Sequence, residues 1–251
     1  MLEKKKCPYC KCETLYSNDK LEHCFNCNMT KFFSEENQDK VGTFNVNKLS
    51  KIEEGSFWFK YITEKRKINK EFITSKYIFE KDGKMLLCNE PDKNGNIDFY
   101  QYKEKESLDI NMNKNKDYLK PKYISVKDRQ KPVMYLNQLT EKQDICICEG
   151  AFSAISFQQI TGVLSCAIFG KNLSSYQVQQ LKSKFNLIKT LYICLDGDCF
   201  KDMCKIYKQL DSFTTPFECK IVKLQDGADP NDYLMYGLEN HLLDIFQNHT
   251  I

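Results

Sequence analysis

From residue 144 to residue 251, strand-like and helix-like stretches alternate regularly along the chain. Short apolar runs are typical of buried strands, and the stretches between them repeat their apolar residues at helical spacing. Since a helix between two strands returns the chain to the start of the next strand, this order predicts a parallel sheet with right-handed crossovers. The expected strands are residues 144–149, 163–169, 191–195 and 217–224, within an α/β domain over residues 141–251.

The third expected strand ends in a pair of carboxylates. Five apolar residues, Leu191–Leu195, lead directly into Asp196, Gly197 and Asp198, and such a run is typical of a central strand covered on both faces. Open α/β sheets bind ligands at the C-terminal ends of their strands, where two aspartates can hold divalent cations through oxygen ligands. Because Asp-Gly is also common turn chemistry, a strand followed by a simple turn is the alternative interpretation.

Acidic residues follow the other strands as well, and the predicted sheet brings them to one edge. Carboxylates that meet there repel one another unless cations lie among them, so several acids at that edge favour a metal site. Asp229 also precedes Pro230, as a helix N-cap precedes a proline at the first helical position. The acids expected at this edge are Glu149, Asp196, Asp198, Asp226 and Asp229.

Two C-x2-C pairs lie in the first thirty residues, separated by a loop of 13 residues. A two-residue gap lets a tight turn aim both thiolates at one cation, and two such turns supply the four tetrahedral ligands of a structural zinc ion. Cys12 or His23 could replace one of the four, and scattered core cysteines are the alternative. We predict a zinc ribbon over residues 1–32 that recognises nucleic acid and needs its metal to fold. The predicted ligands are Cys7, Cys10, Cys24 and Cys27.

The region between the cysteine pairs and the α/β domain has a weaker pattern. Residues 33–55 are polar and rich in turn formers, so we predict a linker. A helical pattern follows, with a second short helix near residues 70–75 and a hairpin of strands 85–88 and 97–100 around an Asn-Gly turn. These features predict an α+β subdomain over residues 56–140.

Charge is unevenly distributed along the chain, whose net charge is +3. The first 140 residues carry 27 basic and 21 acidic side chains, whereas the remainder carries 10 and 13. Residues 111–131 are the most basic stretch, and the interleaved Tyr118 and Tyr123 suit a groove for single-stranded nucleic acid. A solvated loop would have the same composition. A basic N-terminal part and an acidic C-terminal part nevertheless favour a protein that binds a polyanion beside an acidic, metal-loaded site.

Cysteine use and hydropathy predict a reducing compartment. Several of the 13 cysteines lie inside apolar strands, as Cys146 and Cys194 do, where a reduced thiol behaves as a small hydrophobic group. The sequence has no apolar run long enough to cross a bilayer and no signal-peptide pattern. We therefore expect a cytoplasmic protein without a membrane partner, in the cytoplasm of the bacterial host if a phage encodes it.

The acidic motifs, read together with the cysteine pairs, resemble a known family. They are similar to the signature of the TOPRIM domain, which bacterial and phage-type primases, topoisomerases and some nucleases share. A zinc ribbon ahead of that domain narrows the resemblance to DNA primases. The motifs that carry it are Glu149-Gly150, Asp196-Gly197-Asp198 and Asp229-Pro230.

Two segments of the middle region also fit the resemblance. Residues 61–68 are similar to a short helix of the family that carries a Lys-Arg pair, here with Arg66. Residues 94–101 are similar to its Asn-Gly hairpin before a basic residue, here Lys103. The resemblance thus covers nearly the whole chain. No helicase segment follows residue 251, so it implies a stand-alone primase with a separate replicative helicase as its partner.

The resemblance implies a DNA-directed RNA polymerase that joins ribonucleoside triphosphates into short primers on single-stranded DNA during replication. Asp196 and Asp198 would hold two Mg2+ or Mn2+ ions, while Glu149 would bind metal or accept the proton of the attacking 3′-hydroxyl. Asp229 and Asp232 would support a metal, and the zinc ion would be structural. The predicted contacts to nucleotide or template are Arg66, Lys103, Lys120, Lys122 and Lys171.

Two positions depart from the family pattern, and two other functions compete with the primase. The family often places an aspartate where this chain has Ser153, and another where it has Asn231, which affects the number and strength of the metal sites. A TOPRIM nuclease would use the same acids to activate water. A non-catalytic recombination mediator that pairs zinc with a TOPRIM domain would bind DNA without turnover, and the intact Asp-Gly-Asp argues against it.

Overall fold

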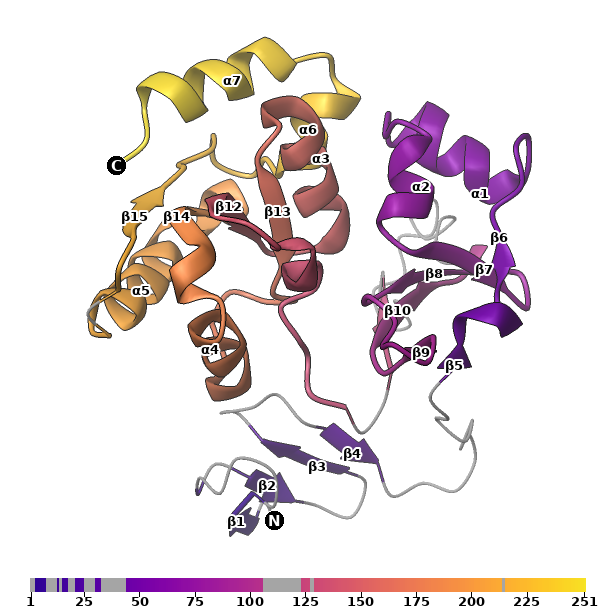
Figure 1. Ribbon diagram of the computed structural model, residues 1–251, viewed down its shortest axis with the longest axis horizontal. Coiled ribbons are helices and arrows are strands. Elements are labelled where there is room, and N and C mark those ends of the chain that lie inside the picture. Colours follow the sequence, from indigo (N-terminus) through magenta and orange to yellow (C-terminus); the bar gives the residue numbers. More distant parts are fainter. Residues whose placement is uncertain are drawn as a thin grey trace, which may run out of the picture. The chain divides into compact units, whose positions relative to one another are not determined.

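The computed structural model describes residues 3–7, 13, 15–17, 21–24, 30–32, 44–105, 123–126, 129–213 and 215–251. The chain divides into two compact units, whose elements are labelled in Figure 1. The first unit is Met1–Lys60 with Lys70–Gln130, and the second is Tyr61–Asn69 with Lys131–Ile251. Within the described ranges, no helix has the length and apolar character needed to cross a membrane.

The N-terminal part of the first unit is a small antiparallel sheet in the order β1-β2-β3-β4. The side chains of Cys7, Leu15 and Cys24 are buried together and form its core. Cys10, Cys12 and Cys27 lie outside the described residues, so only one cysteine of each expected zinc-binding pair is placed. The strands are β1 (Glu3–Lys5), β2 (Leu15–Ser17), β3 (Leu21–Cys24) and β4 (Thr30–Phe32).

The rest of the first unit combines an antiparallel sheet, in the order β11-β10-β8-β7-β6, with a two-stranded sheet of β5 and β9. Two short helices, α1 (Phe57–Lys60) and α2 (Glu71–Ser75), confirm the expected helical pattern. The strands are β5 (Phe44–Asn45), β6 (Ser50–Lys51), β7 (Ile78–Lys81), β8 (Lys84–Cys88), β9 (Asn96–Ile97), β10 (Tyr100–Lys103) and β11 (Ile124–Ser125).

Two expectations for this unit need correction. In the stretch expected to be a linker, residues 33–43 lie outside the described residues, whereas residues 44–55 contain β5, the 3-10 turn η1 (Val46–Lys48) and β6. The Val46 N–H donates to Gly95 O at 2.7 Å, which draws this stretch onto the Asn-Gly turn. In the expected hairpin, β8 pairs with β10 rather than with Ile97, whose strand pairs with β5. Neither pairing could be predicted from the sequence, because β5, β6 and β9 are only two residues long and lie in largely polar stretches.

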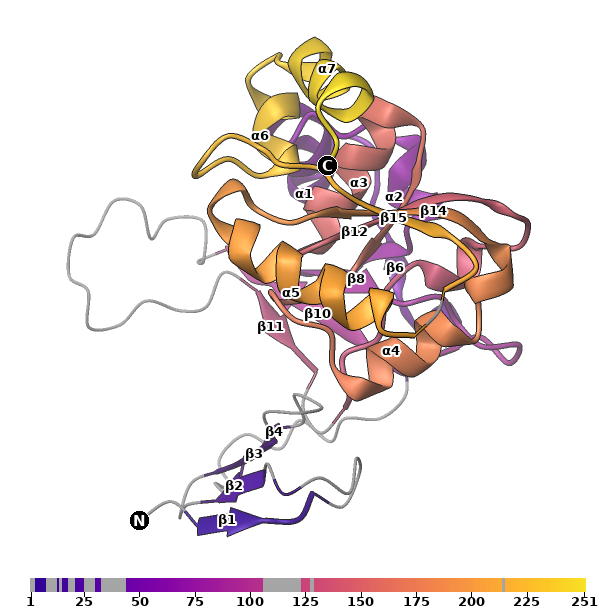
Figure 2. The same ribbon diagram turned by 90° about the vertical axis from the view of Figure 1, so that its left-hand side faces the viewer.

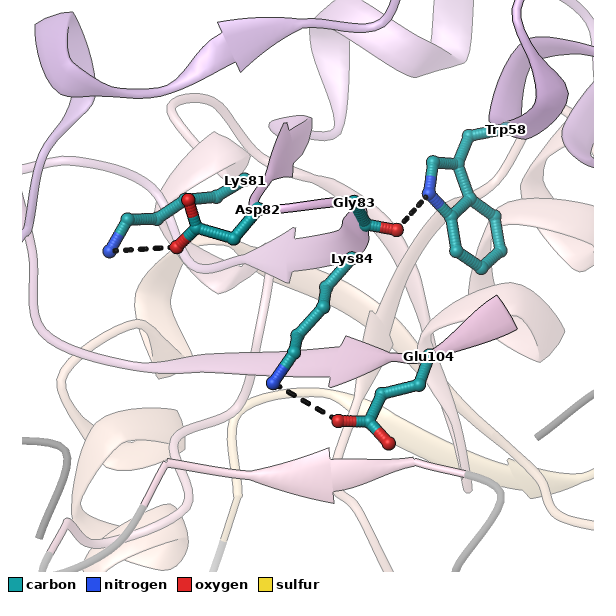
Figure 3. A network of polar contacts seen from close by, with 6 residues as sticks. All are labelled: Trp58, Lys81, Asp82, Gly83, Lys84 and Glu104. Atoms are coloured by element: carbon teal, nitrogen blue, oxygen red, sulfur yellow. Dashed lines mark hydrogen bonds and ion pairs between the residues drawn. The ribbon is translucent and has the colours of Figure 1, made fainter. Parts of the chain in front are cut away.

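A buried tryptophan fixes α1 to the hairpin of β7 and β8 (Figure 3). The indole Nε1 of Trp58 donates to the carbonyl oxygen of Gly83 at 3.0 Å. Asp82 and Gly83 form the hairpin turn with φ of 51° and 73°, the left-handed conformation that favours glycine. Beside this turn, Lys84 pairs with Glu104 at 3.0 Å. The turn is therefore anchored from one side by an indole and from the other by an ion pair.

The second unit is built on a parallel sheet in the order β13-β12-β14-β15, which confirms the expected α/β domain. Its strands are β12 (Gln143–Cys148), β13 (Leu164–Ala167), β14 (Ile188–Cys194) and β15 (Glu218–Ile221). Its helices are α3 (Ala151–Thr161), α4 (Ser175–Lys182), α5 (Phe200–Asp211), α6 (Pro230–Met235) and α7 (Glu239–Asn248). Three short 3-10 turns complete it: η5 (Leu136–Gln138), η6 (Phe185–Leu187) and η7 (Gly197–Cys199).

Helices cover both faces of this sheet, α4 and α5 on one side and α3, α6 and α7 on the other (Figures 1 and 2). The α4/α5 side is an aliphatic core in which Ile147 and Ile193 pack with Leu181 and Met203. On the opposite side, the Phe246 ring of α7 lies 4.8 Å from that of Tyr192, between centroids. Cys146, Cys148 and Cys194, in β12 and β14, are buried and form no disulfide, as expected of reduced thiols in a core. Burial on both faces explains the continuous apolar strands of the sequence.

The segment Tyr61–Asn69 joins the second unit although it lies far upstream in the chain. It begins with a π-helical turn, η2 (Tyr61–Lys65), directly after α1. The side-chain amide of Gln159 in α3 accepts from the Asn69 N–H at 2.8 Å and donates to Lys67 O at 2.9 Å. These bonds hold the segment against α3.

Candidate active site

Three adjacent strands deliver carboxylates to one edge of the parallel sheet. Glu149 follows β12, Asp196 and Asp198 follow β14, and Asp229 follows β15 as the N-cap of α6. Burial, followed by the charges of Glu149, Asp229 and Asp198, raises the pKa of Asp196 to about 7. Burial is also the main cause that raises the pKa of Glu149, with contributions from the charges of Asp198 and Asp229. The acids are therefore close enough to repel one another, as the sheet order predicts.

Asp198 has a different environment from Asp196. Its Oδ1 accepts from the thiol of Cys199 at 3.0 Å, and its Oδ2 lies 3.6 Å from Nζ of Lys171. The hydrogen bond from Cys199 and the charge of Lys171 lower the pKa of Asp198. The same thiol lies 3.9 Å from Oε2 of Glu149. Two neighbouring aspartates thus differ in their affinity for a proton, because one is buried among acids and the other has a cation beside it.

Gly197 separates the two aspartates because no side chain fits at its position. A Cβ atom there would overlap with the carbonyl oxygen of Gln225, in the loop that follows β15. The Gly197 N–H donates to Ala228 O at 2.9 Å, which holds the two loops together. The glycine is therefore required by close backbone approach, rather than by the turn chemistry that Asp-Gly often indicates. This contact places Asp196 and Asp198 beside the loop that carries Asp226 and leads to Asp229.

Asp229 and Asp232 form a capping box at the start of α6. Oδ1 of Asp229 accepts from the N–H groups of Asn231 and Asp232 at 2.7 and 3.0 Å. Oδ2 of Asp232 accepts from the Asp229 N–H at 2.8 Å. Pro230 occupies the first helical position, as the sequence predicts. Each of the two acids commits one oxygen to the cap.

The two positions where the family often has aspartate are both buried. Ser153 is 7% exposed in the first turn of α3, and Asn231 is 1% exposed in α6. Oδ1 of Asn231 accepts from Nη1 of Arg66 at 2.7 Å. Its Nδ2 donates to Arg66 O at 3.0 Å and to Ser156 Oγ at 2.8 Å. The Asn231 amide therefore connects structural elements within the second unit.

Arg66 was predicted to contact nucleotide or template, and its guanidinium lies against the same unit. Nε donates to the hydroxyl of Tyr61 at 3.0 Å, and Cζ lies 5.4 Å from the ring centroids of both Tyr61 and Phe152. The neighbouring residues Lys65 and Lys67 are exposed. Within this basic triplet, the arginine faces the protein and the lysines face solvent.

Of the other basic residues predicted to contact nucleotide or template, only Lys171 and Lys103 are among the described residues. Lys171 lies at the acidic cluster, through its pair with Asp198. Lys103 belongs to the first unit, where it is 3% exposed and its Nζ lies 4.9 Å from the ring centroid of Tyr123. Lys120 and Lys122 lie outside the described residues.

Lys131 is a cation near the site, and no motif in the sequence distinguishes it from the neighbouring lysines. Its Nζ donates to the carbonyl oxygen of Phe169 at 3.2 Å. Burial lowers the pKa of Lys131, and the charge of Glu149 opposes that shift. In the sequence it was one of six lysines in the basic stretch, and its only distinguishing feature was its position before Pro132, ahead of β12.

The donor set fits hard divalent cations. The converging acids supply carboxylate oxygens, the ligands that Mg2+ and Mn2+ prefer, and their mutual repulsion would be relieved by positive charge. Among the described residues, no three His, Cys, Asp or Glu side chains are arranged closely enough to hold one ion. Lys171 and the capping N–H groups engage oxygens of Asp198 and Asp229 in this arrangement. Residues Glu149, Asp196, Asp198 and Asp229 are the ones that would hold a metal.

The acidic residues of the candidate site lie in a segment that matches a known protein family. Residues 146–234 match the family model described as Toprim-like. No curated protein sequence matches the chain. Among solved structures, the primase fragment of the bacteriophage T7 primase-helicase protein is similar over 98% of this chain and 99% of its own, with 13% identity and a TM-score of 0.56.

Two bacterial-type primase structures are similar as well. The zinc-binding and RNA polymerase domains of the Aquifex aeolicus primase match 100% of this chain and 81% of their own, at 15% identity and a TM-score of 0.54. The DnaG catalytic core matches 75% of this chain and 71% of its own, at 14% identity and a TM-score of 0.54. Residues 146–234 therefore form a Toprim-like domain, and the chain has the fold of bacterial and phage DNA primases.

Proposed function

We propose that this chain is a DNA primase that synthesises short RNA primers on single-stranded DNA by metal-dependent nucleotidyl transfer. The observation that carries the proposal is the convergence of acids from three adjacent strands on one edge of a Toprim-like domain, with the pKa of Asp196 raised to about 7. The fold supports it, because the similarity to the T7 primase fragment extends over nearly the full length of both chains.

The acidic residues take distinct roles in this proposal. Asp196 and Asp198 bind the metals, Glu149 binds metal or accepts the proton of the 3′-hydroxyl, and Asp229 supports a metal from the α6 cap. Bound Mg2+ or Mn2+ would stabilise charge on the α-phosphate and lower the pKa of the 3′-hydroxyl. Lys171 and Lys131 place positive charge beside Glu149 and Asp198, where the phosphates of a ribonucleoside triphosphate would approach.

The N-terminal sheet is proposed to bind a structural zinc ion and to contact the DNA template. Among the described residues, Cys7 and Cys24 are buried together beside Leu15, and many small domains of this kind fold only when a metal is bound. The Aquifex aeolicus structure is described as having a zinc-binding domain. The similar T7 fragment comes from a primase-helicase protein, so we also propose a replicative helicase as a partner.

Primer synthesis on varied single-stranded DNA templates tests the proposal directly. The purified chain is incubated with labelled ribonucleoside triphosphates and Mg2+ or Mn2+, and short RNA products are expected. Asp196→Asn and Asp198→Asn should each reduce synthesis by about 100-fold or more, since each removes a metal ligand. Asp211→Asn, which neutralises an exposed acid at the end of α5, is the matched control and should leave the rate unchanged.

The same assay separates the two competing functions. Degradation of labelled DNA by the chain and metal without nucleotides, lost in Asp196→Asn, would replace the primase by a nuclease. Tight DNA binding with neither synthesis nor cleavage would indicate a non-catalytic mediator. Either outcome overturns the primase assignment and leaves the Toprim-like fold in place.

A further inference from the structure

Lys171 reaches across the sheet to a carboxylate that belongs to a distant strand. It follows β13, whereas Asp198 follows β14, and β12 with Glu149 lies between these strands. Nζ of Lys171 nevertheless lies 3.6 Å from Oδ2 of Asp198. A hydrogen bond with Cys199 and the charges of Cys199, Glu149 and Asp198 raise the pKa of Lys171. The ammonium group therefore pairs with Asp198 and lies within the electrostatic influence of Glu149 as well.

The backbone before Lys171 is shaped to hold it there. Phe169 has φ of 56°, which is uncommon for a residue with a side chain, and Gly170 has φ of 156°. The Phe169 N–H donates to Glu149 O at 2.8 Å, and its carbonyl oxygen accepts from Nζ of Lys131 at 3.2 Å. Unfavourable conformations of this kind persist where surrounding contacts fix them, and they are frequent at functional sites. These contacts of Phe169 therefore fix the backbone position of Lys171.

The pair between Lys171 and Asp198 is also easy to break. The two side chains are 42% and 63% exposed, and exposed ion pairs contribute little to stability. Lys131 differs, because its partly buried ammonium group is bound to a carbonyl oxygen. Of these two cations, Lys131 is therefore fixed, whereas Lys171 can leave its carboxylate at little cost.

We propose that Lys171 is an internal counter-cation, which neutralises Asp198 before metal binds and then moves to the phosphates of the incoming nucleoside triphosphate. The inference rests on the proposed function for its second step only. A divalent cation on Asp198 would repel the ammonium group, since the two would compete for the same carboxylate. Nucleotide phosphates are the anions that a metal at this position recruits, so they become the next partner of Lys171.

Mn2+ binding without nucleotide tests the first step. Titration calorimetry on the full chain compares the wild type with Lys171→Met, Lys171→Arg and Lys189→Met. Lys171→Met should bind Mn2+ about three- to tenfold more tightly, because the competing charge is gone. Lys171→Arg keeps the charge and should match the wild type. Lys189 pairs with Asp144 at the opposite end of the sheet, so Lys189→Met should also match it. Equal Mn2+ affinity in Lys171→Met and the wild type would overturn the proposal.

Nucleotide binding tests the second step. With saturating Mn2+, a non-hydrolysable ribonucleoside triphosphate should bind Lys171→Met about tenfold more weakly than the wild type. Unchanged nucleotide affinity in a variant with tighter Mn2+ binding would overturn the transfer to phosphate. Neither measurement requires primer synthesis, so a failure of this proposal can be told apart from a failure of the primase assignment.

Discussion

Arg66 and Asn231, which are 165 positions apart, are joined by hydrogen bonds at both ends of the Asn231 amide. Nη1 of Arg66 donates to Oδ1 at 2.7 Å, and Nδ2 donates to Arg66 O at 3.0 Å. A carboxylate at this position could accept from the guanidinium but could not donate to the carbonyl. The asparagine therefore suits a connection in which the partner presents a donor and an acceptor together.

Asn231→Ala should destabilise the second unit. It removes the donor to the partly buried carbonyl oxygen of Arg66 and to the buried hydroxyl of Ser156, and we expect a loss of about 2–4 kcal/mol in the free energy of unfolding. Denaturant unfolding followed by circular dichroism gives this value. Asn248→Ala removes a single exposed bond to Asp244 and should change stability by about 0.5 kcal/mol or less. Equal effects of the two substitutions would show that the Asn231 network contributes nothing.

Gly197→Ala should disrupt the site through the backbone. The added methyl group would collide with Gln225 O, so the loop leading to Asp229 must move, and we expect a loss of about 2–4 kcal/mol in stability. Mn2+ affinity should fall by about tenfold or more, because the acids lose their common edge. Gly150→Ala, in the turn between β12 and α3, is the control. Its nearest atom would be Ser153 Oγ at 3.9 Å, an ordinary contact, so it should leave Mn2+ affinity unchanged.

Asp196 should make metal-free stability and Mn2+ affinity depend on pH in opposite directions. Its pKa is raised from 3.8 to about 7, so the folded state holds the proton more tightly than the unfolded chain. Its contribution to stability is therefore complete below pH 3.8 and is lost as the pH rises to about 7. Metal requires the ionised carboxylate, so Mn2+ affinity should rise up to about pH 7 and then level off.

Calorimetric titrations from about pH 5.5 to pH 8.5 measure this dependence. Asp196→Asn should bind Mn2+ weakly and lose most of the pH dependence, whereas Asp211→Asn should retain both affinity and slope. A wild-type affinity that stays constant across this range would contradict the assignment of Asp196 as the titrating ligand.

The parallel sheet and its acidic edge could be predicted because each depends on local patterns. Apolar runs marked the strands, and the topology rule for alternating elements then brought Glu149, Asp196 and Asp229 together. The Arg66–Asn231 connection was beyond that reasoning, since it links residues far apart in the chain through side-chain geometry. Lys131 was hidden for a similar reason, because only the fold shows which lysine of a basic stretch lies beside Glu149. For Gly197, the sequence suggested only turn chemistry as an alternative explanation, whereas the constraint comes from a neighbouring loop.

Trp58→Phe should destabilise the first unit and leave the second unchanged. The substitution removes the indole N–H that Gly83 O accepts and leaves space in a fully buried site, so we expect a loss of about 1–3 kcal/mol. Amide hydrogen exchange locates the effect: protection should fall in β7 and β8, while β12 and β14 keep theirs. Lys84→Met, at the start of β8, breaks the partly exposed pair with Glu104 and should cost about 1 kcal/mol or less. Equal loss of protection in both sheets would show that the units do not unfold separately, and that the Trp58 anchor stabilises the whole chain.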